Sequence, residues 1–482
     1  MKQRASVDEE LELLNQIIAH DPGNADAFIN RATALHKVGR LNEAVASFDQ
    51  AIALGPDNAS AFHGRGHVLK DMNRLHDALT SYDQTIALDP NRADAWKNRG
   101  TVLLQLSRLE EAEANFDRAI ALKPGFAEAY NNRGTALHYL RRLDEAVASF
   151  DRAIATKPGF ANAIFNRGLA KLLGGNLREG WADYEWRWKS KGFRPPREFD
   201  GPIWRGEDLA GRSIAIDAHE QGLGDVIQFA RYLPLLVQRK AKVSLLAPRK
   251  LVRLLRPLLS EIEIVTSTDF GRPFDFYCPL MSLPFAFGTE LSSIPNRVSF
   301  LKAEEELVAR WKKRLGGHGF KIGIGWQVGV SQDRARSIPL AEFIPLSRIP
   351  NVRLISLQKE HGLEQFAGLP AGTQMEELSD GFDNGPDAFI DTAAVMANLD
   401  LIVTADISIA HVAGALGRPT WIGLKYVPDW RWLLDRNDSP WYPTVRLFRQ
   451  QTDGDWRSVF SNIERELRAM LTDRGKKPDC KF

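Results

Sequence analysis

The chain has 482 residues and carries 63 Lys and Arg side chains against 61 Asp and Glu side chains, which gives a formal net charge of +2 at pH 7. This length predicts about two to four domains. The near balance of charge argues against a protein built to bind nucleic acid or a charged membrane surface.

The two cysteines, Cys278 and Cys480, lie far apart, so they exclude a disulfide framework and form no metal-binding pattern. The first residues, MKQRASVDEELELL, lack the apolar stretch of a secretion signal. No run of about eighteen apolar residues occurs that would span a membrane. We therefore expect a cytoplasmic protein without a transmembrane segment.

The first part of the chain repeats with a fixed period. Prolines recur every 34 residues, at Pro22, Pro56, Pro90, Pro124 and Pro158. In the copy that begins at Ala93, the aromatic, small and proline positions are filled by Trp96, Gly100, Ala112, Phe116, Ala119 and Pro124. Further copies begin at Ala25, Ala59, Ala127 and Ala161. These residues resemble the tetratricopeptide repeat, which implies an all-α solenoid of about five repeats over residues 1–192, capped by a helix from Asp8 to His20.

A solenoid of helix pairs presents a concave groove, so the expected partner of this region is a peptide or another protein. Asn30, Asn98, Asn132 and Asn166 share one repeat position, and Gly64 interrupts the series. Side-chain amides in a groove can pair with the backbone of an extended peptide, because each amide both donates and accepts. The series resembles the asparagine ladder of protein O-GlcNAc transferases. The alternative is that Asn is simply common at this position of such repeats.

The segment from Gly180 to Arg205 loses the helical period and is rich in aromatic residues, namely Trp181, Tyr184, Trp186 and Trp188. No basic groove accompanies these rings, so we expect them to pack the final repeat against the next domain instead of stacking on bases.

Strands and helices alternate from Arg212 onward, which predicts an α/β region. The first strand, Arg212 to Ala218, leads into the segment HEQGLGDV and a helix. Gly222 and Gly224 suit a close approach of the backbone to a ligand, because glycine has no Cβ. The match to a dinucleotide fingerprint is poor, since Ile227 stands where the third glycine belongs.

Asp225 would project from the first turn of that helix. It is either a helix N-cap or a general base that faces an acceptor, with His219 and Glu220 as alternative bases. Gln228 and Arg231 follow on the same helix face, and we expect them to help form the acceptor pocket.

A second α/β unit begins with the strand KIGIGW, and its strands end in polar residues. Trp326 and Gln327 end the first strand, a loop with Arg336 follows, and Gln358 and Lys359 end the second. The carboxyl ends of parallel strands meet at one edge of a sheet, where a single ligand can touch them all. We expect Trp326, Gln327, Gln358 and Lys359 to bind a nucleobase and ribose, with Trp326 as a core residue as the alternative.

The stretch from Asp391 to Leu424 is predicted as helix, strand, loop, helix and strand, with Asp391 and Thr392 capping the first helix. Asp406 stands at the strand end, and the second helix begins at Ser408. The free main-chain N–H groups of its first turn should attract an anion, with His411 one turn further on. Alternatively, Asp406 and Ser408 are only caps and His411 is a hydrogen-bonded helix residue.

Two successive Rossmann-like α/β units with a cleft between them, and a final helix from Val459 to Leu471 that could cross back, indicate the GT-B architecture. The segments GLGDVIQFARYLP, RARSIP, SLQKE and DISIAHVAGALGRP together resemble the ADP-heptose:lipopolysaccharide heptosyltransferase-like family, glycosyltransferase family 9. The order of repeats and α/β region is that of bacterial tetratricopeptide proteins that carry such a domain.

The resemblance implies a metal-independent, inverting transfer of a sugar from a nucleotide-sugar donor, with no other cofactor. It implies acceptor binding by residues 193–300, donor binding by residues 301–482, Asp225 as the base and Arg336 on the donor diphosphate. Asp406, Ser408 and His411 fall in the family's donor motif, but Ile407 and Ser408 replace its threonine and glycine, so heptose is not implied.

Two rival functions remain open from the sequence. One is a protein glycosyltransferase in which the repeats deliver polypeptide acceptors, which the asparagine series favours. The other is a scaffold whose repeats bind proteins and whose α/β region no longer catalyses a reaction.

Overall fold

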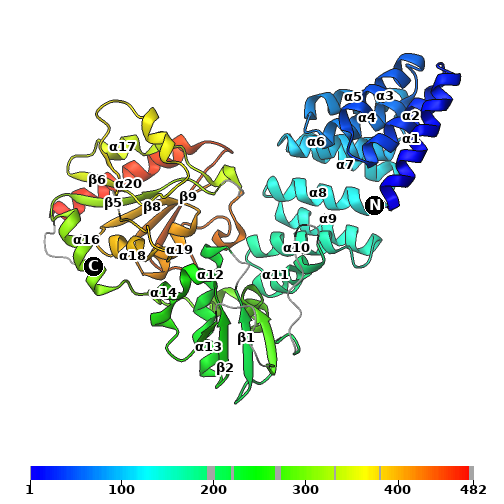
Figure 1. Cartoon of the computed structure of the whole chain (residues 1–482). Helices are drawn as coiled ribbons and strands as arrows, with labels where there is room; N and C mark the ends of the chain where they lie inside the picture. The colour runs from blue at the N-terminus through cyan, green and yellow to red at the C-terminus, as the bar shows by residue number, and fades with distance from the viewer. Residues whose placement is uncertain are drawn as a thin grey trace. The chain divides into compact units, whose positions relative to one another are not determined.

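The structure is a computed structural model, and it describes residues 2–190, 192, 201–218, 222–265, 273–329, 333–378 and 381–476 (Figure 1). The chain divides into two compact units. One unit contains the residues up to Ala170, and the other contains Lys171–Trp188 and the α/β region that follows. Among the described residues, no helix combines the length and the hydropathy needed to cross a membrane.

The first unit consists of a capping helix, α1(Lys2–His20), followed by helix pairs. The pairs are α2(Ala25–Lys37) with α3(Leu41–Leu54), α4(Ala59–Asp71) with α5(Leu75–Leu88), α6(Ala93–Gln105) with α7(Leu109–Leu122), and α8(Ala127–Tyr139) with α9(Leu143–Thr156). A last pair, α10(Ala161–Leu173) and α11(Leu177–Tyr184), begins in the first unit and ends in the second. The helix pairs follow the predicted period of 34 residues.

The period depends on small residues that face aromatic rings. A Cβ added at Gly100 would lie 2.7 Å from a ring carbon of Phe116, and one at Gly134 would lie 2.7 Å from a ring carbon of Phe150. Both rings are buried in the unit's core. The two helices of a pair therefore approach to a distance that a larger side chain at the glycine would prevent.

An arginine ladder, which the sequence analysis did not predict, joins successive pairs. Each arginine donates a 2.6 Å hydrogen bond to an aspartate sixteen residues earlier: Arg65 to Asp49, Arg99 to Asp83, Arg133 to Asp117 and Arg167 to Asp151. Three of them also donate to a polar group sixteen residues later: Arg65 to Ser81, Arg99 to Asn115 and Arg133 to Ser149. Each of these three arginines thus connects the second helices of two neighbouring repeats.

The first lobe of the second unit contains a four-stranded parallel sheet in the order β3-β2-β1-β4. Its strands are β1(Ser213–Asp217), β2(Lys242–Leu246), β3(Glu263–Val265) and β4(Phe276–Pro279). Its α-helices are α12(Leu223–Phe229), α13(Leu233–Gln238), α14(Val252–Leu255) and α15(Leu283–Ala286).

The second lobe contains a six-stranded parallel sheet in the order β10-β9-β8-β5-β6-β7. Its strands are β5(Phe320–Gly325), β6(Val352–Ser356), β7(Met375–Glu376), β8(Leu401–Ala405), β9(Thr420–Leu424) and β10(Val445–Arg449). The chain therefore reverses its direction of winding between β5 and β8, as in doubly wound folds. Gly325 pairs with Thr404, so the carboxyl ends of these two strands lie level.

Helices cover the second sheet: α16(Glu305–Leu315), α17(Ile344–Ser347), α18(Ile390–Met396), α19(Ser408–Ala415) and α20(Trp456–Lys476). The final helix α20 contacts β9, β10 and α17. Val459, Phe460 and Ile463 belong to the buried core of this sheet. Its described part therefore packs on the second lobe, where we had expected it to cross back.

Two rings of the aromatic segment that begins at Gly180, Trp181 and Tyr184, pack against the α/β region, as the sequence predicted. Trp181 meets Trp430 edge-on at 5.0 Å between ring centroids, and Tyr184 lies 6.2 Å from the same ring. Arg187, in η1(Glu185–Lys189), is buried and donates to Ser282 at 2.7 Å. Helix α11 is thus built into the core of the second unit.

Gly100→Val should destabilise the repeats by about 1–3 kcal/mol, because the new side chain would overlap the Phe116 ring. Gly125→Val is the matched control, since a Cβ at Gly125 meets no atom within 4 Å. Urea unfolding of the full chain, followed by circular dichroism, measures both. Equal stability of the two variants would contradict the packing described for the repeats.

Candidate functional site

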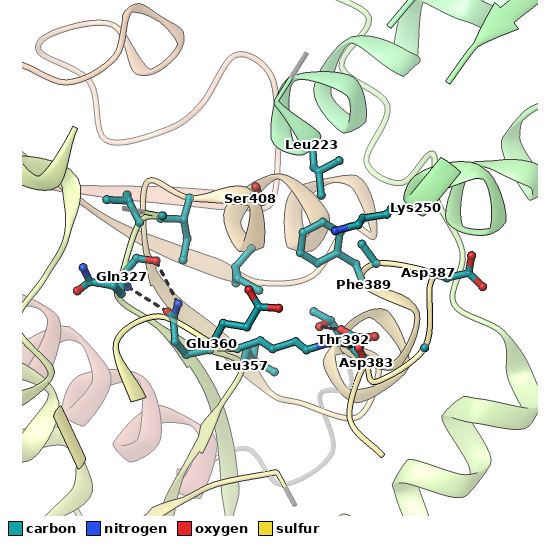
Figure 2. Close-up of a pocket in the computed structure, with 18 of the residues that line it drawn as sticks. Leu223, Lys250, Gln327, Leu357, Glu360, Asp383, Asp387, Phe389, Thr392 and Ser408 are labelled. Atoms are coloured by element: carbon teal, nitrogen blue, oxygen red, sulfur yellow. Dashed lines mark hydrogen bonds between the residues drawn. The ribbon is translucent and has the colours of Figure 1, made fainter. Parts of the chain in front are cut away.

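A cavity of ≈ 390 Å³ lies at the carboxyl edge of the second sheet, where the strand order reverses (Figure 2). The strand ends contribute Gln327 after β5 and Gln358 and Lys359 after β6. The loop before α18 and the start of α19 supply most of the remaining wall, and Leu223 and Lys250 enter from the first lobe. The sequence analysis predicted this edge, because ligands of open α/β sheets bind outside the carboxyl ends of the strands.

The start of α19 forms one wall of the cavity, through Ile407, Ser408 and Ile409. Ile407 is the N-cap residue, and within the described part of the chain no side chain caps this helix start with a hydrogen bond. Asp406 and Ser408 therefore do not act as side-chain caps of α19. The first main-chain N–H groups of an uncapped helix attract an anion.

Gln327, Gln358 and Lys359 line the cavity, but their polar groups also hold the loops in place. The Gln358 side chain accepts from the main-chain N–H groups of Trp326 and Gln327, at 3.1 and 3.0 Å, and donates to the Gln327 carbonyl at 3.1 Å. The Lys359 ammonium donates to the main-chain oxygen of Asp383. These residues shape the site by fixing its backbone.

Trp326 does not line the cavity. Its side chain is fully buried in the core of the second sheet, where Nε1 donates to the Gly362 carbonyl at 3.3 Å and the ring packs against Phe366. The interpretation of Trp326 as a core residue therefore fits the structure, and stacking on a nucleobase does not.

Helix α18 has a cap that the sequence analysis missed. Asp383 accepts hydrogen bonds from the Asp391 main-chain N–H at 2.7 Å and from the Thr392 side chain at 2.5 Å. Asp391 instead accepts from Arg310 and Trp311, each at 2.6 Å. Asp383 caps the helix from eight residues away in sequence, and a local capping pattern does not reveal such a contact.

Asp225 lies in a charged cluster beside α19 and does not itself line the cavity. The Arg431 guanidinium, in η10(Trp430–Trp432), donates to Asp225, to Asp429 at 2.8 Å and to Gln228 Oε1 at 2.7 Å. Burial raises the pKa of Asp225, and the positive charge of Arg431 opposes that rise. Its pKa is also lowered by a main-chain hydrogen bond from Gly222, so the carboxylate interacts with the start of its own helix.

Asp406 and Arg336 complete this charged cluster. Arg336 donates to the Asp406 main-chain oxygen at 3.2 Å, and its guanidinium lies 3.8 Å from Asp406 Oδ2. That buried oxygen has no hydrogen-bond partner among the described residues. Burial and the nearby Asp429 carboxylate raise the pKa of Asp406 to about 6. Arg336 therefore lies at the end of β8, against Asp406, and is not part of the cavity wall.

Gly224 and His411 form the contact between α12 and α19. A Cβ at Gly224 would lie 2.9 Å from His411 Cδ2 and 3.4 Å from Ser408 Oγ, so the absence of a side chain serves helix packing. His411 is buried, its Nδ1 lies 2.9 Å from the Tyr442 hydroxyl, and its ring stacks on Trp432. Burial holds the pKa of His411 well below its usual range, so the ring is neutral at pH 7. These contacts favour His411 as a hydrogen-bonded helix residue.

Gln228 and Arg231 were expected in an acceptor pocket, but both are buried and connect the lobes. Arg231 donates to the main-chain oxygens of Trp441 and Pro295, and it lies over the Tyr442 ring at 4.4 Å. Gln228 accepts from Arg431. Their role in the structure is to hold α12 against the second lobe.

In the repeat unit, the asparagine series forms ties between neighbouring repeats. Asn98 Nδ2 lies 2.9 Å from His63 Nε2 and 2.8 Å from His67 Nε2 in the preceding repeat. Asn132 donates to Thr101 and Asn166 donates to Asn131, both at 3.1 Å. Asn30 is exposed. The amides of the last three members of the series are thus already engaged within the unit.

Comparison with known proteins confirms the repeats. Models of the tetratricopeptide repeat match residues 13–46, 34–73, 63–127 and 127–160. The curated Protein FlbA of Caulobacter vibrioides is 29% identical over 319 residues, which are 61% of this chain and 53% of that protein. This chain therefore spans about half the length of that relative.

Two solved structures are also similar to this chain. One is YrrB, described as a TPR protein with an unusual peptide-binding site, at 25% identity over 38% of this chain and 95% of that chain, with a TM-score of 0.33. The other is a tetratricopeptide repeat protein from Parabacteroides merdae ATCC 43184, at 20% identity over 39% and 74%, with a TM-score of 0.36. The family models show that the chain carries tetratricopeptide repeats, and a C-terminal α/β region that contains parallel sheets follows them.

The histidines that contact Asn98 should make the repeats sensitive to acid. Burial lowers the pKa of His63 and of His67 to about 4, below the usual 6.5. The unfolded chain therefore takes up protons first as the pH falls from 6.5 towards 4, and stability is lost across that window. His67→Gln should reduce the loss between pH 7 and pH 5 by about 1–2 kcal/mol.

Chemical unfolding of the full chain at pH 7, 6 and 5 measures this effect. His76→Gln, a substitution at an exposed residue of α5, serves as the control and should leave the pH dependence unchanged. A pH dependence that is the same in wild type and His67→Gln would show that the buried imidazole is not the titrating group.

Proposed function

We propose that the α/β unit is a glycosyltransferase of GT-B architecture that binds a nucleotide sugar and transfers the sugar, without a metal ion, to a glycan or protein acceptor. The observation that carries this proposal is the open cavity against the uncapped start of α19. The strand order supports it, because the cavity lies where a doubly wound sheet binds its ligand. The segment resemblance to glycosyltransferase family 9 supplies the reaction class.

The chemistry requires that negative charge on the leaving nucleoside diphosphate be stabilised as the glycosidic bond breaks. Main-chain N–H groups fixed before the reaction lower the barrier, because they need no reorganisation when the charge develops. The first N–H groups of α19, at Ser408 and Ile409, are suited to this role, since these residues line the cavity.

Asp225 is the proposed base that removes the proton from the acceptor hydroxyl as the hydroxyl attacks. A carboxylate whose pKa is raised by burial is a stronger base than an exposed one. Arg431 holds one carboxylate oxygen, Oδ1, and so fixes the direction in which the second oxygen points.

A repeat scaffold with a non-catalytic α/β unit is the second candidate, and one observation favours it. Asp225 is paired with Arg431 and does not line the cavity, so the proposed base is not open to the proposed donor site. Incubation of the full-length protein with a panel of UDP-, GDP-, ADP- and CMP-linked sugars separates the two candidates. Release or transfer of sugar supports the enzyme, whereas binding without turnover across the panel supports the scaffold.

Ser408→Pro tests the anion site at α19. Proline is tolerated at the first position of a helix but has no N–H to donate. Ile407 has the extended conformation that a residue before proline requires, with φ −137° and ψ 175°. We expect about tenfold weaker nucleoside diphosphate binding by calorimetry, while Ser408→Ala binds as wild type does. Unchanged affinity in a folded Ser408→Pro protein would remove α19 from the donor site.

Asp225→Asn tests the base. It retains a group that can accept from Arg431, so the fold and donor affinity should change little, while turnover falls by about 10²–10⁴-fold. Asp208→Asn, a substitution at an exposed residue of the same lobe, is the control and should keep full activity. A fully active Asp225→Asn enzyme would assign the proton transfer to another group.

A further inference from the structure

Lys250 brings an unused positive charge into the cavity from the first lobe. Among the described residues, its ammonium has no hydrogen-bond or ion-pair partner, although Lys250 lines the cavity (Figure 2). Neighbouring cations are engaged: Arg253 forms ion pairs with Glu304 and Asp387, and the Lys359 ammonium donates to the main-chain oxygen of Asp383. Lys250 is therefore the cation of this group that remains available to a ligand.

A main-chain hydrogen bond holds Lys250 against the part of the cavity wall that the second lobe supplies. Lys250 lies in η3(Arg249–Leu251), just beyond the carboxyl end of β2, and its carbonyl accepts a 2.8 Å hydrogen bond from the Ala388 N–H. Ala388 directly precedes Phe389 in the second lobe. This main-chain hydrogen bond joins the two lobes and sets the position of Lys250 relative to Phe389.

Phe389 presents an aromatic ring to the same cavity. Its backbone is in the left-handed region, with φ 64° and ψ 16°, which a bulky residue seldom adopts. The conformation is held on one side by the Ala388 hydrogen bond to Lys250 and on the other by Asp383, which accepts from Asp391 and Thr392 at the start of α18. Figure 2 shows the Lys250 and Phe389 side chains on the same side of the cavity, across from Gln327.

The cation that the family resemblance places on the donor diphosphate is engaged elsewhere. Arg336 donates to the Asp406 carbonyl and lies near the Asp406 carboxylate, and it does not line the cavity. A diphosphate at the start of α19 would therefore meet N–H groups on one side and, from the first lobe, the Lys250 ammonium on the other.

We infer that Lys250 and Phe389 form a two-lobed clamp for a nucleoside diphosphate: the Lys250 ammonium pairs with the diphosphate and the Phe389 ring stacks on the base. This inference rests on the proposed function, because it concerns the same cavity. It assigns the charge of the donor site to the first lobe, so that a bound nucleotide bridges both lobes and stabilises their contact.

Isothermal titration of the full-length protein with UDP, ADP and GDP, and with the corresponding nucleosides, tests the clamp. For the nucleotide that wild type binds best, Lys250→Ala should lower diphosphate affinity at least tenfold and leave nucleoside affinity within twofold. The salt dependence of diphosphate binding should also become shallower, because one ionic contact is lost. Lys242→Ala, at the opposite end of β2, is the matched control and should bind as wild type does.

Phe389→Ala should weaken both the diphosphate and the nucleoside at least fivefold, and Phe389→Tyr, which keeps the ring, should restore both. Thermal unfolding of each variant shows whether it is folded. If wild type binds a nucleoside diphosphate and Lys250→Ala binds it with the same affinity, the clamp is wrong and the proposed function still stands. Absence of binding by wild type to any of the three diphosphates would overturn both.

Discussion

The contact between α12 and α19 at Gly224 determines where the cavity and the charged cluster lie. Glycine at this position lets the first turn of α12 approach Ser408 and His411 of α19 to a distance that any side chain would prevent. Two helix starts, each with a partial positive charge, are thereby brought together. Two arginines hold the contact closed, because Arg231 reaches from the first lobe to Trp441 while Arg431 reaches from the second lobe to Asp225 and Gln228.

The same contact explains the unusual electrostatics beside the cavity. Three carboxylates, Asp225, Asp406 and Asp429, lie with two guanidinium groups, Arg336 and Arg431, in a region that is largely buried. Acidic groups near helix starts are favourable. Burial nevertheless disfavours the charged form of a carboxyl group, and here three carboxylates face only two guanidinium groups. The raised pKa of Asp406, at about 6, is the consequence. The cluster therefore carries more carboxylates than guanidinium groups, and it lies next to a cavity that Lys250 lines.

Sequence reasoning located the edge of the sheet that carries the cavity, because strand ends and helix starts are local patterns. It placed Gln327, Gln358, Lys359 and Ser408 at that edge, and the structure brings all four to the cavity. It left Trp326 open between a nucleobase contact and a core residue, and the structure buries the ring in the core. One strand residue earlier or later decides whether a ring points into the core or out of it, so the sequence pattern did not choose between the two. It gave Gln228 and Arg231 to an acceptor pocket because a helix face was visible in the sequence and its buried neighbours in the second lobe were not.

The residues that sequence reasoning missed depend on contacts between distant segments. Lys250 follows a strand of the first lobe. The hydrogen bond between its carbonyl and the Ala388 N–H shows that it faces the second lobe, and the sequence gives no sign of this contact. Phe389 directly precedes a helix, and its left-handed backbone depends on Asp383 as a distant cap. The arginine ladder of the repeats was visible as a period of 34 residues, but its partners lie sixteen residues away on both sides and emerge only when the helices pack.

The repeat unit shows why a periodic polar residue is not by itself a peptide-binding site. A side-chain amide that already donates to the preceding repeat must give up that hydrogen bond before it binds a peptide backbone, so the net gain is small. Asn98 is the extreme case, because it contacts two histidines and also accepts from Lys97. Gly64, which interrupts the series, lies in α4 between His63 and His67, so the repeat without an asparagine supplies both of the imidazoles that contact Asn98 of the next repeat. A peptide bound to the repeats would therefore have to bind through groups other than Asn98, or displace the Asn98 amide from both imidazoles at the cost of these two contacts.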